Sequence, residues 1–350
     1  MSNNKKDAHS LKEHNTNMVL GALMIMKTAT RSQLAQKTGL SQPTVNSIVQ
    51  ELENKGYAYP GTFAVSAGGR RPICYTLQTD HLRAVTVRVL PHSLEYVVVK
   101  VDGTVVLRHS WPIAEGDTHI AALQSLIRTL LKQDRNIRVV GVGVPGVVDP
   151  RGVLCAIPQI PELEGVALVR VLNEQLDIPI YVENDMNLVA LGSVIDESGQ
   201  TTLADMVFVH LGEGIGAGIV MGGCIIRGFS SFAGEIAYMV KPLGDSKDDE
   251  TLESLLAQTK EVAQQARLIA DMIVSIICLL NPPVISFGST LASEEMLWHL
   301  RHECEKHLPI WTLPSFKMMP DEAAAYDRGL MALVGDVLKN QIINELAITQ

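Results

Sequence analysis

Two short helices joined by a tight turn are the strongest constraint on how this chain of 350 residues folds. Thr30 can cap the first helix, and a glutamine three residues later completes a capping-box pattern. Gly39 fits a tight turn, and Ser41 can cap a second helix. That helix has Pro43 in its first turn, where the missing N–H needs no partner. Together with an apolar helix over residues 16–28, the pattern predicts a helix-turn-helix.

The second helix of this pair has an apolar face and a polar face. Four apolar side chains recur at helical spacing and predict its buried stripe: Val45, Ile48, Val49 and Leu52. The opposite face, near the helix start, carries short uncharged groups that suit base edges in a major groove: Gln42, Thr44, Asn46 and Ser47. We therefore predict that this helix reads DNA; the alternative is a helical protein-interaction domain.

Residues 57–77 contain two short β-prone runs around a glycine-rich tip, which predicts a wing. Arg70 and Arg71 follow two glycines in an extended segment narrow enough to enter a minor groove. The alternatives are contact with phosphates only, or a solvated linker. Residues 1–80 hold nine Lys/Arg and five Asp/Glu, so this predicted winged helix-turn-helix domain carries +4, whereas the rest of the chain carries −13. Such a basic domain is suited to a polyanion.

Composition is that of an ordinary globular protein, with 47% hydrophobic and 19% charged residues. The N-terminal stretch lacks the apolar segment of a secretory signal. The five cysteines form no C-x-x-C pair, which favours reduced thiols in the cytoplasm over a disulfide framework or a zinc ribbon. The most apolar run, residues 268–280, is too short to span a bilayer and contains Asp271, so we predict a buried helix and no membrane.

Strands and helices alternate from residue 81 onward and predict a mixed α/β sheet. Within this region the run "GEGIGAG", residues 212–218, places glycines at alternate positions between two apolar runs. Close packing of a hairpin and a phosphate cradle both explain such glycines. The run is not the G-x-G-x-x-G of a dinucleotide fold, so we expect no nicotinamide cofactor.

The stretch "IYVENDMN", residues 180–187, places two carboxylates at the end of an apolar run. It predicts a buried strand that delivers Glu183, Asn184 and Asp185 to its carboxyl end, where open α/β sheets bind ligands. Asp185 could deprotonate a hydroxyl or only accept a hydrogen bond from one. It could also cap a helix that starts at Met186.

Several motifs, in one order, cover nearly all of residues 81–350. They are "GVGVPGVVD" (141–149), "VENDMN" (182–187), "GEGIGAGIVMGG" (212–223), "AGEI" (233–236), "TLES" (251–254) and "NPPVISFGS" (281–289). With the helix-turn-helix and "GGRRP" before them, the chain resembles the repressor branch of the ROK family (repressors, open reading frames and sugar kinases). The resemblance implies a two-lobed, actin-like sugar-kinase fold behind the winged helix-turn-helix.

The expected domains follow from this resemblance. Residues 1–80 form the DNA-binding domain, residues 81–187 the first lobe and residues 188–321 the second. The C-terminal helix, 322–350, is a candidate to complete the first lobe. The helix over 262–280 and the apolar segment 329–346 are candidates for dimer or interlobe packing.

The resemblance also implies site residues. Asp185 matches the catalytic base of the family's kinases, Asn184 a sugar-hydroxyl ligand, and Gly146 a glycine whose backbone approaches the sugar. Glu235 and Glu253 match two acidic sugar ligands, and carboxylates accept strong hydrogen bonds from hydroxyls. The structural alternatives are a surface ion pair for Glu235 and a first-turn helix acid for Glu253.

The phosphate loop of the family's kinases, Asp-x-Gly-Gly-Thr, does not match here. The corresponding residues 88–92 read "RVLPH", so Arg88 stands where the metal-binding acid is expected. A nucleotide clamp needs an acid for Mg²⁺ and backbone that can wrap phosphates. We therefore predict no ATP, no cofactor and no enzymatic activity, and interpret Asp185 as a retained hydrogen-bond acceptor.

The family's zinc site is not matched either. Tyr238 stands at the position of the zinc-binding histidine, and the loop that follows contains no cysteine. Its Ser246, Asp248 and Asp249 do not replace three thiolates at such a site. We predict no structural metal.

These observations predict a cytoplasmic transcriptional regulator, most simply a repressor, of carbohydrate-metabolism genes. It would bind a double-stranded operator as a homodimer or a dimer of dimers and respond to a sugar or sugar phosphate between the lobes. One alternative is an ATP-dependent sugar kinase that uses Asp185. Another is a DNA-binding scaffold controlled by a protein partner, with a vestigial cleft.

Overall fold

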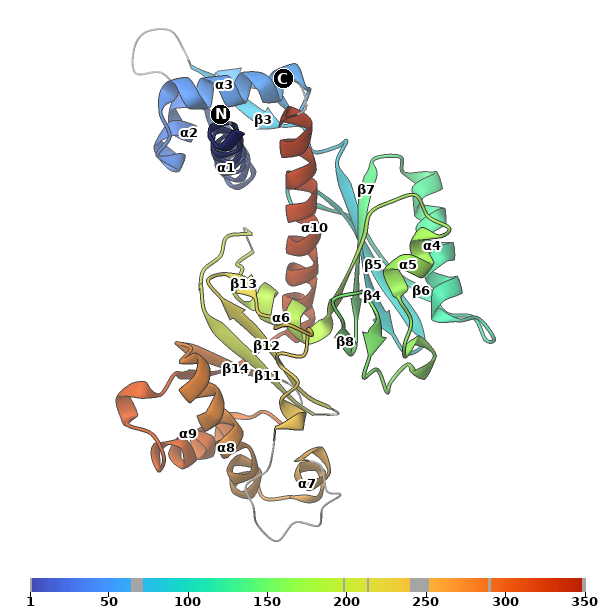
Figure 1. Ribbon diagram of the computed structural model, residues 1–350, viewed down its shortest axis with the longest axis vertical. Helices are drawn as coiled ribbons and strands as arrows, with labels where there is room; N and C mark the ends of the chain where they lie inside the picture. The colour runs from blue at the N-terminus through green and yellow to red at the C-terminus, as the bar shows by residue number, and fades with distance from the viewer. Residues whose placement is uncertain are drawn as a thin grey trace.

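A winged helix-turn-helix lies at one end of the molecule (Figure 1). The computed structural model describes residues 2–63, 72–197, 199–212, 214–239, 252–288 and 291–347. Its first elements are α1 (Ser2–Met26), β1 (Thr28–Thr30), α2 (Arg31–Thr38), α3 (Gln42–Asn54), β2 (Ala58–Phe63) and β3 (Ile73–Leu77). The three strands pair in the order β1-β3-β2.

The predicted helix caps are present. The Thr30 hydroxyl accepts a hydrogen bond from the Gln33 N–H (3.2 Å), and the Gln33 side chain accepts one from the Thr30 N–H (2.8 Å). Gly39 ends α2 at φ +71°, a conformation in which a Cβ is strained. The Ser41 side chain caps α3. The predicted α3 stripe, from Val45 to Leu52, is at most 4% exposed.

The first helix is longer than the pattern predicted. It was expected over residues 16–28 and begins at Ser2. Residues 2–15 contain no glycine or proline, and several of them favour helix, so no residue there stops it.

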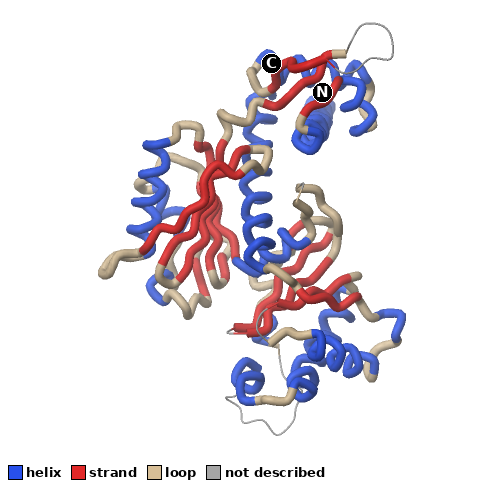
Figure 2. Tube along the Cα trace, turned by 180° about the vertical axis from the view of Figure 1, so that it is seen from behind, coloured by secondary structure: helices blue, strands red, loops and turns tan. Residues whose placement is uncertain are grey.

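A five-stranded sheet with the order β10-β7-β4-β5-β6 follows the winged domain. Strands β4 (Arg83–Leu90), β5 (Ser93–Lys100) and β6 (Val105–Pro112) form an antiparallel meander, and β7 (Ile137–Val144) and β10 (Ile180–Asn184) run parallel to β4. Helices α4 (His119–Gln133) and α5 (Leu168–Asn173) cover one face. The long helix α10 (Glu322–Ala347) packs on the other, as Figures 1 and 2 show. Two short strands, β8 (Val147–Val148) and β9 (Leu154–Cys155), form a small hairpin after β7.

A second five-stranded sheet has the order β13-β12-β11-β14-β15. Its strands are β11 (Met206–Gly212), β12 (Gly214–Met221), β13 (Cys224–Ile225), β14 (Val284–Gly288) and β15 (Ser315–Met318). Its helices α7 (Leu252–Gln258), α8 (Val262–Leu280) and α9 (Glu294–Glu305) share one apolar cluster with β11, β12 and β14. By length and composition alone, α8 is the one helix among the described residues that could cross a membrane, and 44% of its apolar window is buried inside the protein.

Helix α6 (Asp185–Ser193) joins the two sheets, because it packs on both β12 and α10. The approach is close enough to require glycine. A Cβ at Gly192 would lie 1.7 Å from the Ala325 oxygen, and one at Gly329 would lie 2.0 Å from the Leu188 oxygen. A Cβ at Gly218 would lie 2.1 Å from the backbone oxygen at the start of α6. Of the alternating glycines of residues 212–218, Gly216 and Gly218 therefore serve close packing on α6, whereas nothing lies within 4 Å of a Cβ at Gly214.

Helix α10 reaches from the meeting point of the two sheets to the winged domain (Figure 1). One apolar cluster contains side chains of α1, α2 and α3, of strands β4, β5 and β7, and of the second half of α10. Gly141 makes room on β7, since a Cβ there would lie 2.5 Å from Val334 of α10. At the far end, the Tyr57 hydroxyl donates a hydrogen bond to Glu345. The winged domain and the first sheet are thus packed on one helix.

Candidate functional site

The carboxyl end of β10 turns directly into α6, and Asn184 holds this junction. Its Oδ1 accepts a hydrogen bond from the Asn187 N–H (3.0 Å) and caps the helix. Its Nδ2 donates to the Gly146 carbonyl (2.8 Å). Gly146 has φ +96°, and a Cβ there would lie 2.8 Å from the Ala156 oxygen, so a glycine is required. The amide of Asn184 is therefore used to fix the loop after β7.

Asp185 is the first residue of α6 and is half-buried. Its Oδ1 accepts a hydrogen bond from the Met186 N–H at 2.8 Å. Burial raises the pKa of Asp185 to about 6, with the Met186 hydrogen bond and the charges of His210 and Arg88 opposing this rise. A carboxyl with such a pKa can accept or donate a hydrogen bond near neutral pH.

The two predicted glutamates have different surroundings. Glu235 is half-buried, burial raises its pKa, and it is close enough to Asp185 to raise the pKa of that carboxyl. Glu253, on α7, accepts a hydrogen bond from the Ile215 N–H at 2.9 Å and so fixes the start of β12. Hydrogen bonds of the Asn184 side chain join Gly146, Asn184 and Asp185, and the charge of Glu235 acts on Asp185. No contact among the described residues joins Glu253 to Asp185.

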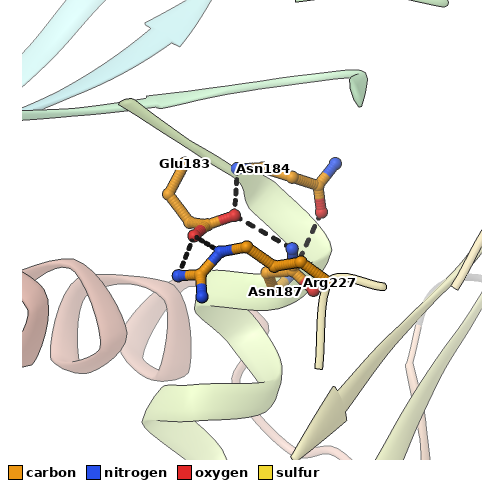
Figure 3. Close-up of polar contacts among 4 residues, drawn as sticks. All are labelled: Glu183, Asn184, Asn187 and Arg227. Atoms are coloured by element: carbon orange, nitrogen blue, oxygen red, sulfur yellow. Dashed lines mark hydrogen bonds and ion pairs between the residues drawn. The ribbon is translucent and has the colours of Figure 1, made fainter. Parts of the chain in front are cut away.

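A charged clamp that the sequence did not predict lies beside this site (Figure 3). Glu183 is 4% exposed, and its Oε2 accepts a hydrogen bond from the Nε of Arg227 at 2.8 Å. Its Oε1 accepts hydrogen bonds from the Asn184 N–H and the Asn187 Nδ2, both at 2.9 Å. Because Glu183 belongs to the first sheet and Arg227 follows the second sheet's β13, the pair connects the two lobes.

Arg88, near the end of β4, lies against the first turns of α10. Its guanidinium carbon lies 4.6 Å from the ring centroid of Tyr326, a cation–π contact. Strands β4 and β5 are joined by a turn of only two residues, Pro91 and His92, and the Leu90 carbonyl faces Nε2 of His119 at 3.0 Å. The segment predicted to lack a phosphate loop is thus a tight hairpin.

The ends of β11 and β14 also meet the start of α10. Nδ1 of His210 lies 3.1 Å from the Glu322 carboxylate. A Cβ at Gly288 would lie 2.3 Å from that same carboxylate. Glu322 therefore fills the space at these two strand ends.

A cavity of about 300 Å³ lies between the first sheet and α10. Its walls come from strands β4, β5 and β6 and from α10: Thr86, Arg88, Glu95, Tyr96, Val97, Arg108, His109, Ser110, Asp327 and Leu330. Arg88 is shared between this cavity and the surroundings of Asp185. None of the five predicted sugar ligands lines the cavity.

The predicted absence of zinc stays a prediction. No group of three or more His, Cys, Asp or Glu side chains that could hold a metal occurs in the described part of the chain. The loop in which the family's cysteines would fall, residues 240–251, lies outside that part. Tyr238 is exposed, and its ring lies 5.2 Å from that of Phe232.

The predicted DNA-reading face of α3 is open. Gln42, Asn46 and Ser47 are exposed. Thr44 is half-buried, and its hydroxyl shares a 2.8 Å hydrogen bond with Ser41, so it supports the helix cap as well. Arg70 and Arg71 lie outside the described residues.

Comparison with known sequences agrees with this architecture. Residues 85–242 match the ROK family, and residues 18–71 match the MarR family. A putative xylose repressor from Caldicellulosiruptor sp. is 26% identical over 67% of this chain and 60% of its own length. The DNA-binding transcriptional dual regulator NagC of Escherichia coli is 27% identical over 61% of this chain and 54% of its own. The chain thus matches little more than half of these relatives' lengths.

A solved structure shows the same fold over almost the whole chain. It is the crystal structure of a ROK family transcriptional regulator described as a homologue of the E. coli MLC protein. It is 16% identical, with a TM-score of 0.75, and the match covers 97% of this chain and all of that one. The predicted fold class, a winged helix-turn-helix before a two-lobed sugar-kinase fold, is confirmed.

Proposed function

Because the chain joins a ROK-family domain to a MarR-like helix-turn-helix domain, we propose that it represses genes of carbohydrate metabolism. It acts in the cytoplasm, binds a double-stranded operator through residues 1–80, and releases the operator when a sugar or sugar phosphate binds between the lobes. One observation carries the proposal. Helix α10 contacts the candidate ligand site through Tyr326 and the winged domain through Glu345.

The ligand site supplies hydrogen-bonding groups from both lobes. Asp185 directly follows β10 of the first sheet, and Glu235 follows β13 of the second sheet. Sugar hydroxyls pair well with carboxylates, and a ligand that touched both would favour one spacing of the lobes. The Glu183–Arg227 clamp lies beside this site, so a change of spacing acts directly on it.

The path to DNA runs along α10. The first half of this helix packs on α6, and its second half shares an apolar cluster with α1 and α3. A shift of α6 against α10 would move the winged domain relative to the first sheet. In a homodimer this changes the spacing of two recognition helices, which must lie about one helical turn of DNA or a multiple apart.

Several observations favour a regulator over an ATP-dependent kinase. The relatives described above are named as repressor and transcriptional regulator. The β4–β5 turn has two residues, and Arg88 brings a cation where Mg²⁺ would need an acid. Release of ADP from ATP in the presence of any hexose would instead support the alternative of a sugar kinase.

The decisive experiment selects fragments of the source genome that bind the purified protein at near-physiological salt, with excess competitor DNA. Salt and competitor are needed because a domain with a net charge of +4 binds DNA of any sequence at low ionic strength. Enrichment of a shared pseudo-palindrome near genes of sugar metabolism supports the proposal. If the selection enriches no shared sequence, the proposed function is contradicted.

A second experiment separates effector control from a scaffold controlled by a protein partner. Asp185→Asn and Glu235→Gln are compared with the wild type for operator binding and for release by sugars. The effector proposal expects intact operator binding and lost release. Unchanged release in both variants would favour the scaffold.

A further inference from the structure

Arg88 places a charge in the interlobe region with no carboxylate paired to it. Among the described residues, its guanidinium contacts the ring of Tyr326 and takes part in no hydrogen bond or ion pair. Glu95 is directly opposite on β5 and lines the same cavity, yet the two do not form an ion pair. A half-buried arginine whose N–H groups form no hydrogen bond or ion pair can still bind an anion.

Of the other charged groups of the cavity, Arg108 and Asp327 are paired with each other, and Glu95 forms no ion pair among the described residues. Arg108 forms a 2.5 Å ion pair with Asp327, which connects β6 to α10. Thr86 and Ser110 add hydroxyls to the wall. The 300 Å³ cavity is at the small end of ligand pockets, a size that suits a monosaccharide or its phosphate rather than a nucleotide.

Tyr326 supplies a second indication. Its side chain is 1% exposed, and its hydroxyl has no hydrogen-bond partner. The hydroxyl lies over Gly143, where a Cβ would come within 1.7 Å of it. Buried polar groups are rarely left without a partner, so this hydroxyl is an unsatisfied donor on the residue whose ring carries the Arg88 guanidinium.

We propose that this cavity is the subsite for the phosphoryl group of a phosphorylated sugar, with Arg88 as its principal ligand. Asp185 and Glu235 take hydroxyls of the same molecule, since Arg88 is shared between the cavity and the surroundings of Asp185. The inference deepens the proposed function and rests on it. It selects the phosphorylated sugar over the free sugar as the effector.

Phosphate fits this arginine better than a neutral group does. A guanidinium offers two parallel N–H donors to phosphate oxygens, and the Ser110 hydroxyl can add a further donor, whereas the Thr86 hydroxyl already donates to the Val97 carbonyl at 3.4 Å. The Arg88 guanidinium rests on Tyr326 of α10, so a bound phosphoryl group would be fixed against the helix that reaches the winged domain.

The test measures ligand binding without DNA, by calorimetry, on the full chain and two variants. Arg88→Gln removes the charge; Arg170→Gln removes an exposed arginine of α5, paired only with Glu174, and serves as the control. The probes are hexose 6-phosphates and pentose 5-phosphates, the matching free sugars, the matching sugar acids and inorganic phosphate, at equal ionic strength. Thermal unfolding and operator binding of each variant confirm that it folds.

We expect a sugar phosphate to bind the wild type about tenfold or more tightly than its free sugar, a difference of about 1.4 kcal/mol. Arg88→Gln should abolish that difference while binding of the free sugar stays unchanged, and Arg170→Gln should leave both affinities intact. Equal affinity for free and phosphorylated sugar, full phosphate binding by Arg88→Gln, or no binding of any phosphorylated probe would overturn the inference. So would a preference for the sugar acids or for inorganic phosphate.

The two proposals fail in different ways. If the protein binds an operator but no phosphorylated sugar, the proposed function still stands and the phosphate subsite is contradicted. If the protein binds a sugar phosphate through Arg88 but selects no operator, the phosphate subsite is supported and the proposal of a repressor is contradicted.

Discussion

The hydroxyl of Tyr57 donates a hydrogen bond to the carboxylate of Glu345, a residue 288 positions later in the chain. Tyr57 follows α3, and Glu345 lies in the last turn of α10. Burial, followed by the hydrogen bond to Glu345 and its charge, raises the pKa of Tyr57 well above its ordinary value, so the phenol stays protonated and remains a donor. The contact fixes the winged domain to the helix that begins at the ligand site.

Tyr57→Phe should therefore loosen the winged domain while keeping its packing. We expect the free energy of unfolding to fall by about 1 kcal/mol, the usual contribution of one such hydrogen bond, or somewhat more because the acceptor is charged. Ligand-induced release of operator should weaken more than operator binding itself. Tyr59→Phe, at a 46% exposed tyrosine of β2, is the matched control. If the two substitutions change operator release equally, the contact of Tyr57 with Glu345 does not connect ligand binding to the winged domain.

Gly329→Ala tests the contact between α6 and α10. A methyl group there would lie 2.0 Å from the Leu188 oxygen, so the two helices must separate. Overpacking of this kind destabilises by about 1–3 kcal/mol, and we expect urea unfolding to show it, together with an altered affinity for operator.

Gly335→Ala is the control on the same helix. Nothing lies within 4 Å of a Cβ at this position, so the substitution should stabilise α10 by about 0.5–1 kcal/mol through the higher helix propensity of alanine. If both variants change the free energy of unfolding in the same direction, the distance between α6 and α10 does not explain the change caused by Gly329→Ala.

The elements that the sequence predicted well are those determined by neighbouring residues. The capping box of Thr30, the cap of Ser41 and the stripe from Val45 to Leu52 each depend on residues within a few positions of one another. The strand that ends at Asn184 was visible for the same reason. The start of α1 was not, because residues 2–15 carry no signal that distinguishes a free segment from a helix.

The parts of the site that the sequence did not predict depend on residues far apart in the chain. Arg88 meets Tyr326 only because α10 returns to the first sheet, and Gly141 and Gly143 on β7 permit that approach. The partner of Glu183, Arg227, lies in the other lobe. No local pattern marks these pairs, although the two alternating glycines of "GVGVPG" could have indicated that another element packs on β7.

Arg227→Gln should leave the buried Glu183 carboxylate without its cation. We expect a loss of about 1–3 kcal/mol in the free energy of unfolding, less than for a fully buried pair because Arg227 is 43% exposed. Glu183→Gln combined with Arg227→Gln should be less destabilising than Arg227→Gln alone, since no buried charge then remains unpaired. A double-mutant cycle in urea measures the coupling free energy between Glu183 and Arg227. If the losses of the two single substitutions simply add in the double variant, the two residues do not stabilise each other.

Asp185→Asn should stabilise the protein in a pH-dependent way. Burial raises the pKa of Asp185 from 3.8 to about 6, so the folded protein holds its proton more tightly than the unfolded chain does. The free energy of unfolding must then fall as pH rises from about 4 to about 6 and stay lower above that range. Each pKa unit corresponds to about 1.4 kcal/mol, so we expect the variant to gain roughly 1–3 kcal/mol over the wild type at pH 7.5 and little at pH 4. Asparagine retains the oxygen that accepts from the Met186 N–H, so the helix start is preserved. Urea unfolding of both proteins at the two pH values measures the difference, and an equal gain at both would show that Asp185 ionises with an ordinary pKa.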